Sequence, residues 1–401
     1  TSVSFFTLEN PNPMRVSART TRFQESMIRE MTRLAMKHDA INLSQGFPDF
    51  NPPEEVMEAA VKAIRDGVNQ YTVTWGYPPL RQALAKKYTV QLGWEVNPDV
   101  HVAVVCGVTE AITATLLALL DPGDEIIIIE PAHENFRPAA VLAEAVPVSV
   151  PLEKPDYRID PARIERAITP RTRALLFNTP HNPTGRVFDA EEVQGIIDIV
   201  LRHDLVLITD EIYDQILYDG RVHVSPGSYE AVRERTVTCG GMGKTYAMTG
   251  WRLGHIIAPQ PLINAIRPIH DYMTICAPTP LQAAAVAALA LPPSFYAKHL
   301  ADYHERRDVM MDVLYNLGFQ AVRPQGAYYT LADYTNINAP QSDWPAERFA
   351  HWLTTEIRVA AVAGTNFYTV PGYGDGSVRF AFPKRIETLR EAHARLSRML
   401  E

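Results

Sequence analysis

Short apolar segments alternate with helical patterns through the middle of the chain, and this alternation constrains the fold most. Each segment is about five residues long and continuously apolar, which is typical of strands buried on both faces. The expected strands are His101–Cys106, Glu125–Ile129, Val146–Val150, Arg173–Phe177, Leu205–Thr209, Thr236–Cys239 and Leu253–Ala258. The expected helices between them are Thr109–Leu120, Asn135–Ala143, Asp160–Ile168 and Asp189–His203. We therefore predict an α/β fold with a mostly parallel, seven-stranded-type sheet covered by helices.

The C-terminal part of the chain follows a different pattern. A long amphipathic helix is expected over Ser294–Leu317. The shorter elements expected after it are strands at Phe319–Val322, Ala327–Leu331, Arg358–Ala361 and Ser377–Phe382, and helices at Trp344–Glu356 and Ile386–Leu400. The first 49 residues lack a core of their own. We predict a large domain at residues 50–292 and a smaller α+β domain formed by both chain ends, residues 1–49 and 293–401.

Composition excludes several classes of protein. The formal net charge is −8, whereas a nucleic-acid-binding protein normally shows a basic face. No apolar run approaches the roughly 18–20 residues of a membrane span, and Thr1–Phe6 does not resemble a signal peptide. Cys106, Cys239 and Cys276 share no CxxC spacing. We therefore expect no disulfide framework, no metal site and a cytoplasmic location.

Ligands of an open α/β sheet bind beyond the C-terminal ends of its strands, so polar residues just after strands are candidates. Gly107, Val108 and Thr109 open a helix whose free amides could bind an anion, although an ordinary N-cap is the alternative. Asn182 lies in the Pro-rich turn Asn178–Gly185, which would fix its side chain for a ligand. An Asx-turn before the next helix is the alternative there.

Asp210, Tyr213 and Arg379 are further candidates. An Asp at the end of a buried strand is costly unless it pairs with a cation, and the alternative is a surface acidic cap. Tyr213 could point the same way if the chain turns helical after Asp210. Arg379 lies on an apolar strand and needs an anionic partner, which could be a ligand or an internal salt bridge.

Lys244 lies on the Gly-rich loop Cys239–Gly254. A Walker A motif would need Gly at Thr238, and no GxGxxG follows a strand, so neither a P-loop nor a dinucleotide site is expected. A semi-buried Lys is a good imine-forming nucleophile, and Arg252 suits a phosphate. A Lys, a carboxylate and a phosphate cup at one sheet edge together indicate pyridoxal phosphate as cofactor.

At this point the sequence resembles the class I/II aminotransferases of fold type I, over Ile41–Phe382. The matching blocks occur in family order. They are Asn42–Phe50, Gln70–Thr72, Gly76–Leu80, His181–Gly185, Asp210–Tyr213, Gly243-Lys244 and Gly250–Arg252. The block Gln45–Phe50 is most similar to the kynurenine, glutamine and methionine aminotransferase branch. The resemblance implies a large domain with a mostly parallel sheet and a smaller α+β domain.

The resemblance implies roles around the cofactor ring. Lys244 would form the internal aldimine and later move the proton between Cα and C4′. Asp210 would keep the ring nitrogen protonated. Asn182 and Tyr213 would hydrogen-bond the phenolate oxygen. These residues are therefore expected to be the catalytic and ring-binding groups.

The resemblance also implies how phosphate and substrate are held. Arg252 and the amides of the turn Gly107, Val108 and Thr109 would bind the phosphate. Tyr71 would reach the cofactor of the neighbouring subunit, which implies a homodimer. Substrate would be bound by Arg379 as a fork on the α-carboxylate, assisted by Gly46 and Asn182. Phe47 and Tyr328 are candidates for the side-chain pocket.

Two positions depart from the family pattern. Gly241 stands three residues before Lys244, where the family usually has Ser. His133 stands where an aromatic residue usually stacks on the cofactor ring; an imidazole can stack, but it can also titrate near neutral pH. Drift within a tolerant family is one interpretation. The alternative hypothesis is that His133 alters reaction specificity or substrate choice.

The expected activity is transfer of an amino group from an L-amino acid to a 2-oxo acid by a ping-pong mechanism. No second Arg can be placed that would mark aspartate specificity, so aromatic, methionine or glutamine-like donors are favoured. A β-lyase or an amino-acid oxidase or deaminase on the same scaffold is the alternative, because these reactions share the cofactor chemistry. A cofactor-sensing regulator is disfavoured, since the sequence shows no basic helix-turn-helix extension.

Overall fold

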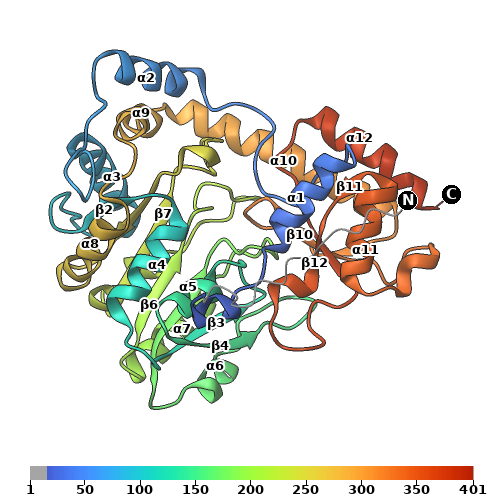
Figure 1. The fold of residues 1–401 in the computed structure, drawn as a ribbon, viewed down its shortest axis with the longest axis horizontal. Helices are drawn as coiled ribbons and strands as arrows, with labels where there is room; N and C mark the ends of the chain where they lie inside the picture. The colour runs from blue at the N-terminus through green and yellow to red at the C-terminus, as the bar shows by residue number, and fades with distance from the viewer. Residues whose placement is uncertain (1–15, 401) are drawn as a thin grey trace, which may run out of the picture.

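The computed structural model describes residues 16–400, so Thr1–Phe6, considered above for a signal peptide, lies outside the described residues. Figure 1 shows a large region built around a sheet and, beside it, a smaller region that contains the C-terminal elements. No helix within residues 16–400 has the length and apolar character needed to cross a membrane.

The central sheet has seven strands in the order β2-β8-β7-β6-β5-β3-β4. Their bounds are β2 Val102–Val105, β3 Glu125–Glu130, β4 Val146–Pro151, β5 Thr172–Asn178, β6 Val206–Asp210, β7 Thr236–Gly241 and β8 Gly254–Ile257. β8 is antiparallel to both of its neighbours, and the other adjacent pairs are parallel. The predicted fold class, with its mostly parallel sheet, is therefore confirmed.

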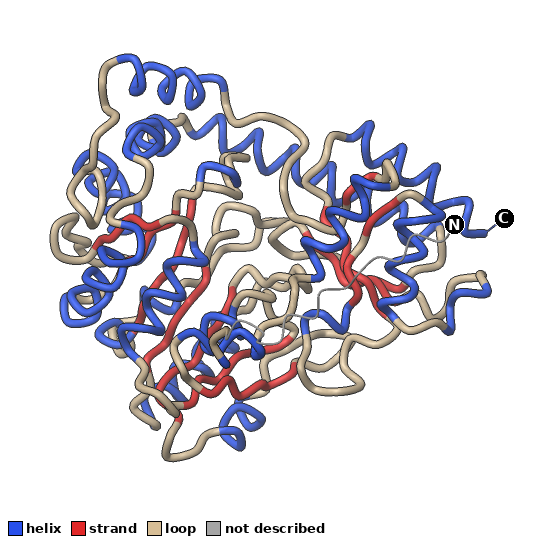
Figure 2. Tube along the Cα trace, in the orientation of Figure 1, coloured by secondary structure: helices blue, strands red, loops and turns tan. Residues whose placement is uncertain are grey.

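Helices cover both faces of this sheet (Figure 2). Ile126 and Ile128 of β3 share an apolar cluster with α4, α5 and α8, whereas Ile127 and Ile129 share one with α6 and α7. The continuous apolar strands therefore follow from burial on both sides. The helices of this region are α2 Glu54–Arg65, α3 Pro78–Leu92, α4 Val108–Leu119, α5 Phe136–Leu142, α6 Pro161–Ala167, α7 Ala190–Arg202, α8 Gln260–Thr274 and α9 Thr279–Leu289.

The smaller region has an antiparallel sheet in the order β12-β13-β10-β9. Its elements are α10 Pro293–Asn316, β9 Gln320–Ala321, β10 Tyr329–Asp333, α11 Ala346–Trp352, β11 Val359–Ala360, β12 Val362–Ala363, β13 Ser377–Ala381 and α12 Ile386–Leu396. Two N-terminal elements join them, α1 Met27–Lys37 and β1 Ile41–Asn42, and β1 pairs in parallel with β11.

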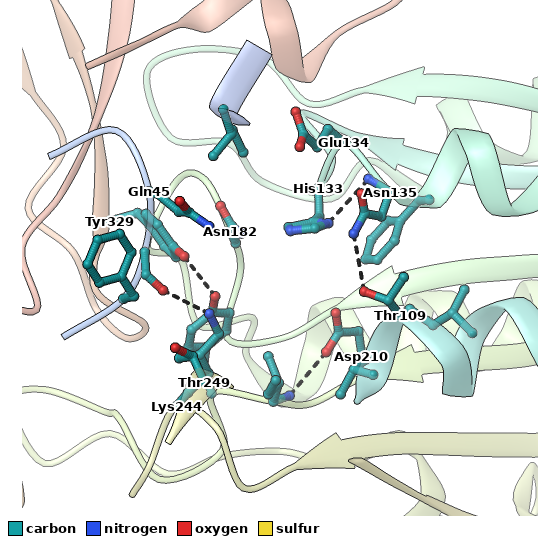
Figure 3. Close-up of a pocket in the computed structure, with 18 of the residues that line it drawn as sticks. Gln45, Thr109, His133, Glu134, Asn135, Asn182, Asp210, Lys244, Thr249 and Tyr329 are labelled. Atoms are coloured by element: carbon teal, nitrogen blue, oxygen red, sulfur yellow. Dashed lines mark hydrogen bonds between the residues drawn. The ribbon is translucent and has the colours of Figure 1, made fainter. Parts of the chain in front are cut away.

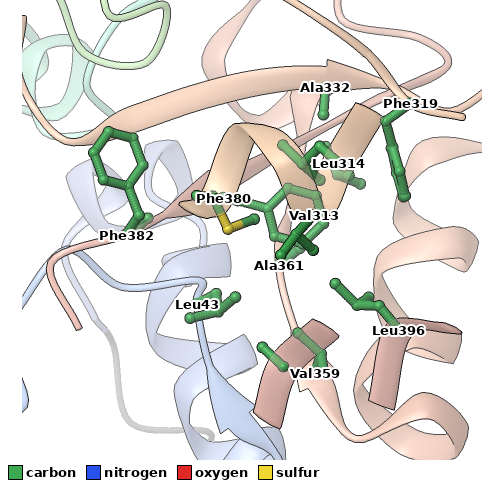
Figure 4. Close-up of a cluster of buried hydrophobic side chains, with 14 of the residues drawn as sticks. Leu43, Val313, Leu314, Phe319, Ala332, Val359, Ala361, Phe380, Phe382 and Leu396 are labelled. Carbon is green, nitrogen blue, oxygen red and sulfur yellow. The ribbon is translucent and has the colours of Figure 1, made fainter. Parts of the chain in front are cut away.

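The two chain ends share one apolar core. Met31 and Leu43 lie in the same buried cluster as Phe380 and Leu396, and Figure 4 shows Leu43 facing the C-terminal side chains. In Figure 1, the blue α1 correspondingly lies among orange and red elements. We propose that this shared core makes the described parts of residues 1–49 and 293–401 the smaller domain and residues 50–292 the larger one.

Several boundaries in the smaller region differ from the sequence-based expectation. The strand expected at Arg358–Ala361 is only the two-residue β11, and β12 follows directly after the expected range in a different sheet. The helix expected at Trp344–Glu356 begins only after Pro345 and ends in a π-helical turn. The strand expected at Ala327–Leu331 starts two residues later, because Ala327 has a left-handed φ of 55° that interrupts an extended strand.

Candidate active site

A cavity of about 480 Å³ opens where the central strands end and the smaller region begins. Figure 3 shows side chains from several strand ends converging on it. The expected site residues that line it are Gly46, Phe47, Val108, Thr109, His133, Asn182, Asp210, Tyr213, Lys244, Arg252 and Arg379. The rule that ligands bind beyond the carboxyl ends of strands therefore predicts the position of this cavity.

Asp210 is the last residue of β6 and is only 6% exposed. Its Oδ1 accepts a hydrogen bond from the Ile212 amide at 3.2 Å, and no cation within residues 16–400 forms an ion pair with it. Burial raises the pKa of this carboxyl from its ordinary value to about 7. The surface-cap alternative is thus wrong: Asp210 is a buried carboxyl that would gain from a cationic partner.

Lys244 follows β7 and is half-buried at the cavity wall. Its Nζ donates to the Gly46 carbonyl oxygen at 3.0 Å. The same atom lies 5.9 Å from the centre of the Tyr213 ring, and the Tyr213 hydroxyl donates to the Tyr329 hydroxyl at 3.1 Å. In the described part of the chain no carboxylate pairs with this amine, so it is available to a ligand.

Arg379 lies on β13 and is 1% exposed. Its Nη1 donates to Asn182 Oδ1 at 3.1 Å, and its Nη2 donates to the Ser44 carbonyl at 2.5 Å. Its Nε is buried and finds no acceptor among the described residues. The internal salt bridge considered above is therefore absent from residues 16–400, and burial lowers the pKa of this guanidinium. A buried cation without a counter-anion indicates a site for an anionic ligand.

The turn before α4 forms a positive cradle. Gly107 has a φ of 83° and precedes the first turn of the helix. A Cβ atom at this position would lie 2.4 Å from Nη2 of Arg252, so glycine lets the guanidinium approach the helix N-terminus. Arg252 Nη1 donates to the Thr249 carbonyl at 3.1 Å. Free amides and a guanidinium at one helix end are suited to a phosphate.

His133 lines the cavity, and Figure 3 shows its ring beside Asn135. Its Nδ1 accepts a hydrogen bond from the Asn135 amide at 3.3 Å, which leaves the proton of a neutral ring on Nε2. Burial, with the charges of Arg379, Lys244 and Arg29, lowers its pKa to about 3. His133 thus stays neutral at physiological pH, contrary to the expectation that it could titrate there.

Gly241, the other departure from the family pattern, is tightly packed. A Cβ atom there would meet the Leu253 carbonyl and the Val108 side chain at 3.2 Å each, and Ile212 at 3.3 Å. A serine would therefore need its neighbours to shift.

Three expected residues do not line the cavity. Gly107 lies behind Arg252, as described above. Tyr71 is 77% exposed on a loop away from the wall. Tyr328 is fully buried, and its hydroxyl donates to the Gly46 carbonyl at 3.0 Å. Its neighbour Tyr329 lines the cavity instead, because consecutive residues of an extended segment point to opposite sides.

The cavity also contains residues that sequence reasoning did not identify. They are Ile28, Arg29, Gln45, Ile112, Glu134, Asn135, Phe136, Ile212, Thr249, Gly250 and Tyr329. Several adjoin expected residues, so proximity in sequence was a usable signal. Arg29 had no such signal, because it lies on α1, far in sequence from every expected site residue.

Comparison with known proteins gives the same picture as the geometry. The family model described as aminotransferase class I and II matches residues 38–396. The chain belongs to this family. Class I and II aminotransferases depend on pyridoxal phosphate, so the protein is a pyridoxal-phosphate-dependent aminotransferase.

The similar proteins are named after several different amino donors. The aminotransferase is 34% identical to kynurenine–oxoglutarate transaminase 1 of Homo sapiens, over 92% of this chain and 94% of the relative. It is 32% identical to methionine aminotransferase of Escherichia coli strain K12, over 97% and 99%. The structure of N-succinyldiaminopimelate aminotransferase from Mycobacterium tuberculosis superposes with a TM-score of 0.92 at 35% identity, covering 96% and 100%. These relatives give no support to the lyase or oxidase alternative.

The residues around the cavity fit the family's cofactor. Asp210 is a buried carboxyl that lacks a cation, which a ring nitrogen bearing a proton would supply. Lys244 offers an amine that forms no ion pair with a carboxylate of residues 16–400. The cradle of Gly107 and Arg252 offers donors to a phosphate. Each of these unmet interactions has its counterpart on pyridoxal phosphate.

Proposed function

We propose that this cavity catalyses amino-group transfer, with one set of its residues binding the cofactor and another set binding the substrate. The observation that carries the proposal is that an unpaired carboxyl, a free amine and an unpaired guanidinium face one cavity, at Asp210, Lys244 and Arg379. When bound, pyridoxal phosphate supplies a ring that withdraws electrons from the substrate Cα.

The protein's own groups would control the proton positions. Asp210 would hold a proton at the ring nitrogen, and Asn182 and Tyr213 would donate hydrogen bonds to the phenolate oxygen. Lys244 Nζ would move the proton between the substrate Cα and C4′ of the cofactor. His133 would cover the ring face. Arg252 and the Val108 and Thr109 amides would hold the phosphate.

Arg379 would bind the α-carboxylate of the amino donor and, in the second half of a ping-pong cycle, that of the 2-oxo acid. The Gly46 amide, Asn182 and Phe47 would complete this contact. We propose aromatic, methionine or glutamine-like donors, since Ile28, Phe47 and Gln45 offer apolar and amide surfaces. The position of Arg29 at the cavity wall favours a second class of amino donors, which carry a carboxylate at the far end of the side chain.

We propose a homodimer because large side chains near the Tyr71 loop are exposed. Tyr71 is 77% exposed, and Tyr272 and Ile275, at the end of the helix α8 that contacts this loop through His270 and Thr74, are exposed as well. Large apolar residues gathered on a surface are typical of an interface. In the proposed dimer this face is covered, and Tyr71 reaches the phosphate bound by the partner subunit.

A panel of L-amino acids tests the activity and its donors. Each donor is mixed with the cofactor-loaded protein, with and without a 2-oxo acid, and the released oxo acid and ammonia are measured. We expect turnover only when the 2-oxo acid is present, with the highest rates for aromatic, methionine or glutamine donors. Ammonia released without an acceptor would contradict transfer and support lyase or oxidase chemistry. Preference for glutamate or aspartate that disappears in Arg29→Ala would favour the second donor class.

A further inference from the structure

A buried histidine–carboxylate pair lies behind the phosphate cradle. His270 on α8 is fully buried, and its Nδ1 lies 2.8 Å from Oε1 of Glu110 on α4. Its Nε2 lies 3.0 Å from the Thr74 carbonyl oxygen. The ring therefore bridges three segments that are distant in sequence.

Hydrogen bonds from three segments hold this pair in place. The Thr74 carbonyl can only accept, so Nε2 must donate to it. Glu110 accepts from the Cys106 amide and from the Thr274 hydroxyl, the latter at 2.8 Å, and both donors favour the ionised carboxylate. Burial alone would raise the pKa of Glu110, but the bonds from His270, Cys106 and Thr274 outweigh it and lower the pKa. The carboxylate oxygen that faces His270 Nδ1 is thus the same oxygen that accepts from Thr274, so α4 and α8 are joined through one buried cluster.

Glu110, one member of the pair, stabilises the turn that forms the phosphate cradle. Glu110 is the third residue of α4, and its carboxylate reaches back to the Cys106 amide just before Gly107. This bond fixes the turn whose φ of 83° at Gly107 brings Arg252 against the helix end. The position of the proposed phosphate donors thus depends on the Glu110 carboxylate.

His270, the other member of the pair, contacts the loop that follows Tyr71. The Val104 amide of β2 donates to the Trp75 carbonyl at 3.0 Å, and the Gly76 amide closes a turn onto the Val73 carbonyl at 2.8 Å. The Arg267 guanidinium of α8 lies 4.9 Å from the centre of the Trp75 ring. The loop is therefore anchored on β2 and α8, and His270 Nε2 adds a hydrogen bond to its Thr74 carbonyl oxygen.

We propose that His270 is a positioning residue that couples cofactor-phosphate binding in one subunit to the loop whose Tyr71 serves the partner subunit. The inference rests on the proposed function, in particular on Tyr71 crossing to the partner. Coupling between two sites is reciprocal. Each bound pyridoxal phosphate should therefore tighten the dimer by the same factor by which dimerisation tightens its own binding.

The test compares the wild type with His270→Gln and Glu110→Gln. His299→Gln serves as the control, because His299 on α10 packs against Phe295 and Tyr303 and touches neither α4 nor the Tyr71 loop. The dimer dissociation constant is measured by sedimentation with and without pyridoxal phosphate, and cofactor affinity is measured by titration of the visible absorbance. If a single variant fails to fold, the paired variant E110Q/H270Q leaves no unpaired buried charge and gives the same readout.

In the wild type we expect pyridoxal phosphate to tighten the dimer by a factor in the range of about 5–150 that coupled sites typically show. In His270→Gln and Glu110→Gln this factor should fall towards one, while His299→Gln keeps it. Variants that retain the wild-type factor, or that bind cofactor less tightly with an unchanged factor, would overturn the inference alone. A wild type that binds no pyridoxal phosphate would overturn the proposed function, and the inference with it.

Discussion

The two ends of the cavity are built in different ways. The phosphate end consists of the turn that follows β2, with Gly107, Val108 and Thr109, and of Arg252 in the segment between β7 and β8. The substrate end brings together Arg29, Gln45, Tyr329 and Arg379 from both chain ends. Local backbone geometry determines the first, and packing of the smaller region determines the second. The difference suggests that cofactor binding and donor selection can be changed separately by mutation.

Asp210 lies between these ends, and its burial predicts the largest effect in free energy. The pKa of its carboxyl is raised to about 7, roughly three units above its ordinary value, which corresponds to about 4 kcal/mol. As pH rises from about 4 to 7, the unfolded chain releases this proton while the folded protein keeps it. The free energy of unfolding of the cofactor-free protein should therefore fall over this range, relative to Asp210→Asn.

Denaturant unfolding of both proteins between pH 4 and 8 measures this difference. Bound pyridoxal phosphate should weaken this pH dependence of the free energy of unfolding, because a cationic partner makes the ionised carboxylate stable in the fold. Parallel pH profiles for the wild type and Asp210→Asn without cofactor would show that burial does not raise the pKa of this carboxyl.

Arg379→Lys tests the substrate end. A lysine keeps the charge but cannot form the fork on a carboxylate. Losing a buried charged contact costs about 2–5 kcal/mol, so kcat/KM for amino donors should fall by roughly 10²–10³-fold. The dissociation constant of pyridoxal phosphate should stay within about twofold of the wild type. Equal losses in both quantities would mean that the two ends are not separable.

Arg252→Ala is the matching change at the phosphate end. Its guanidinium makes charged hydrogen bonds worth about 1.5–3 kcal/mol each, so cofactor affinity should weaken by roughly 10–100-fold. With saturating pyridoxal phosphate, the KM for the amino donor should be nearly unchanged. A variant that binds cofactor normally but loses donor affinity would reverse the assignment of the two ends.

His133→Tyr should have the smallest effect. The neutral imidazole and a phenol can both cover the ring face, so we expect half-reaction rates to change by less than about tenfold. The informative quantity is the ratio of rates across donors in single-turnover measurements. Unchanged rates and selectivity would exclude a role for His133 in donor choice.

Sequence reasoning succeeded where local rules determine position. Asp210, Asn182 and Lys244 follow parallel strands, whose carboxyl ends meet at one sheet edge, so their convergence could be predicted. It could not place Arg29, because the approach of α1 depends on a core shared by both chain ends. Nor could it choose between Tyr328 and Tyr329, since that choice depends on the left-handed backbone just before them.

Visible absorbance of the purified protein is the most direct test of the central claim, that Lys244 holds pyridoxal phosphate in this cavity. After incubation with the cofactor and removal of the excess, the wild type should show the absorption band of a lysine-bound cofactor. Adding a good L-amino-acid donor without an acceptor should convert this band, and the band should be absent from Lys244→Ala. A Lys244→Ala protein that shows the same band would contradict the account.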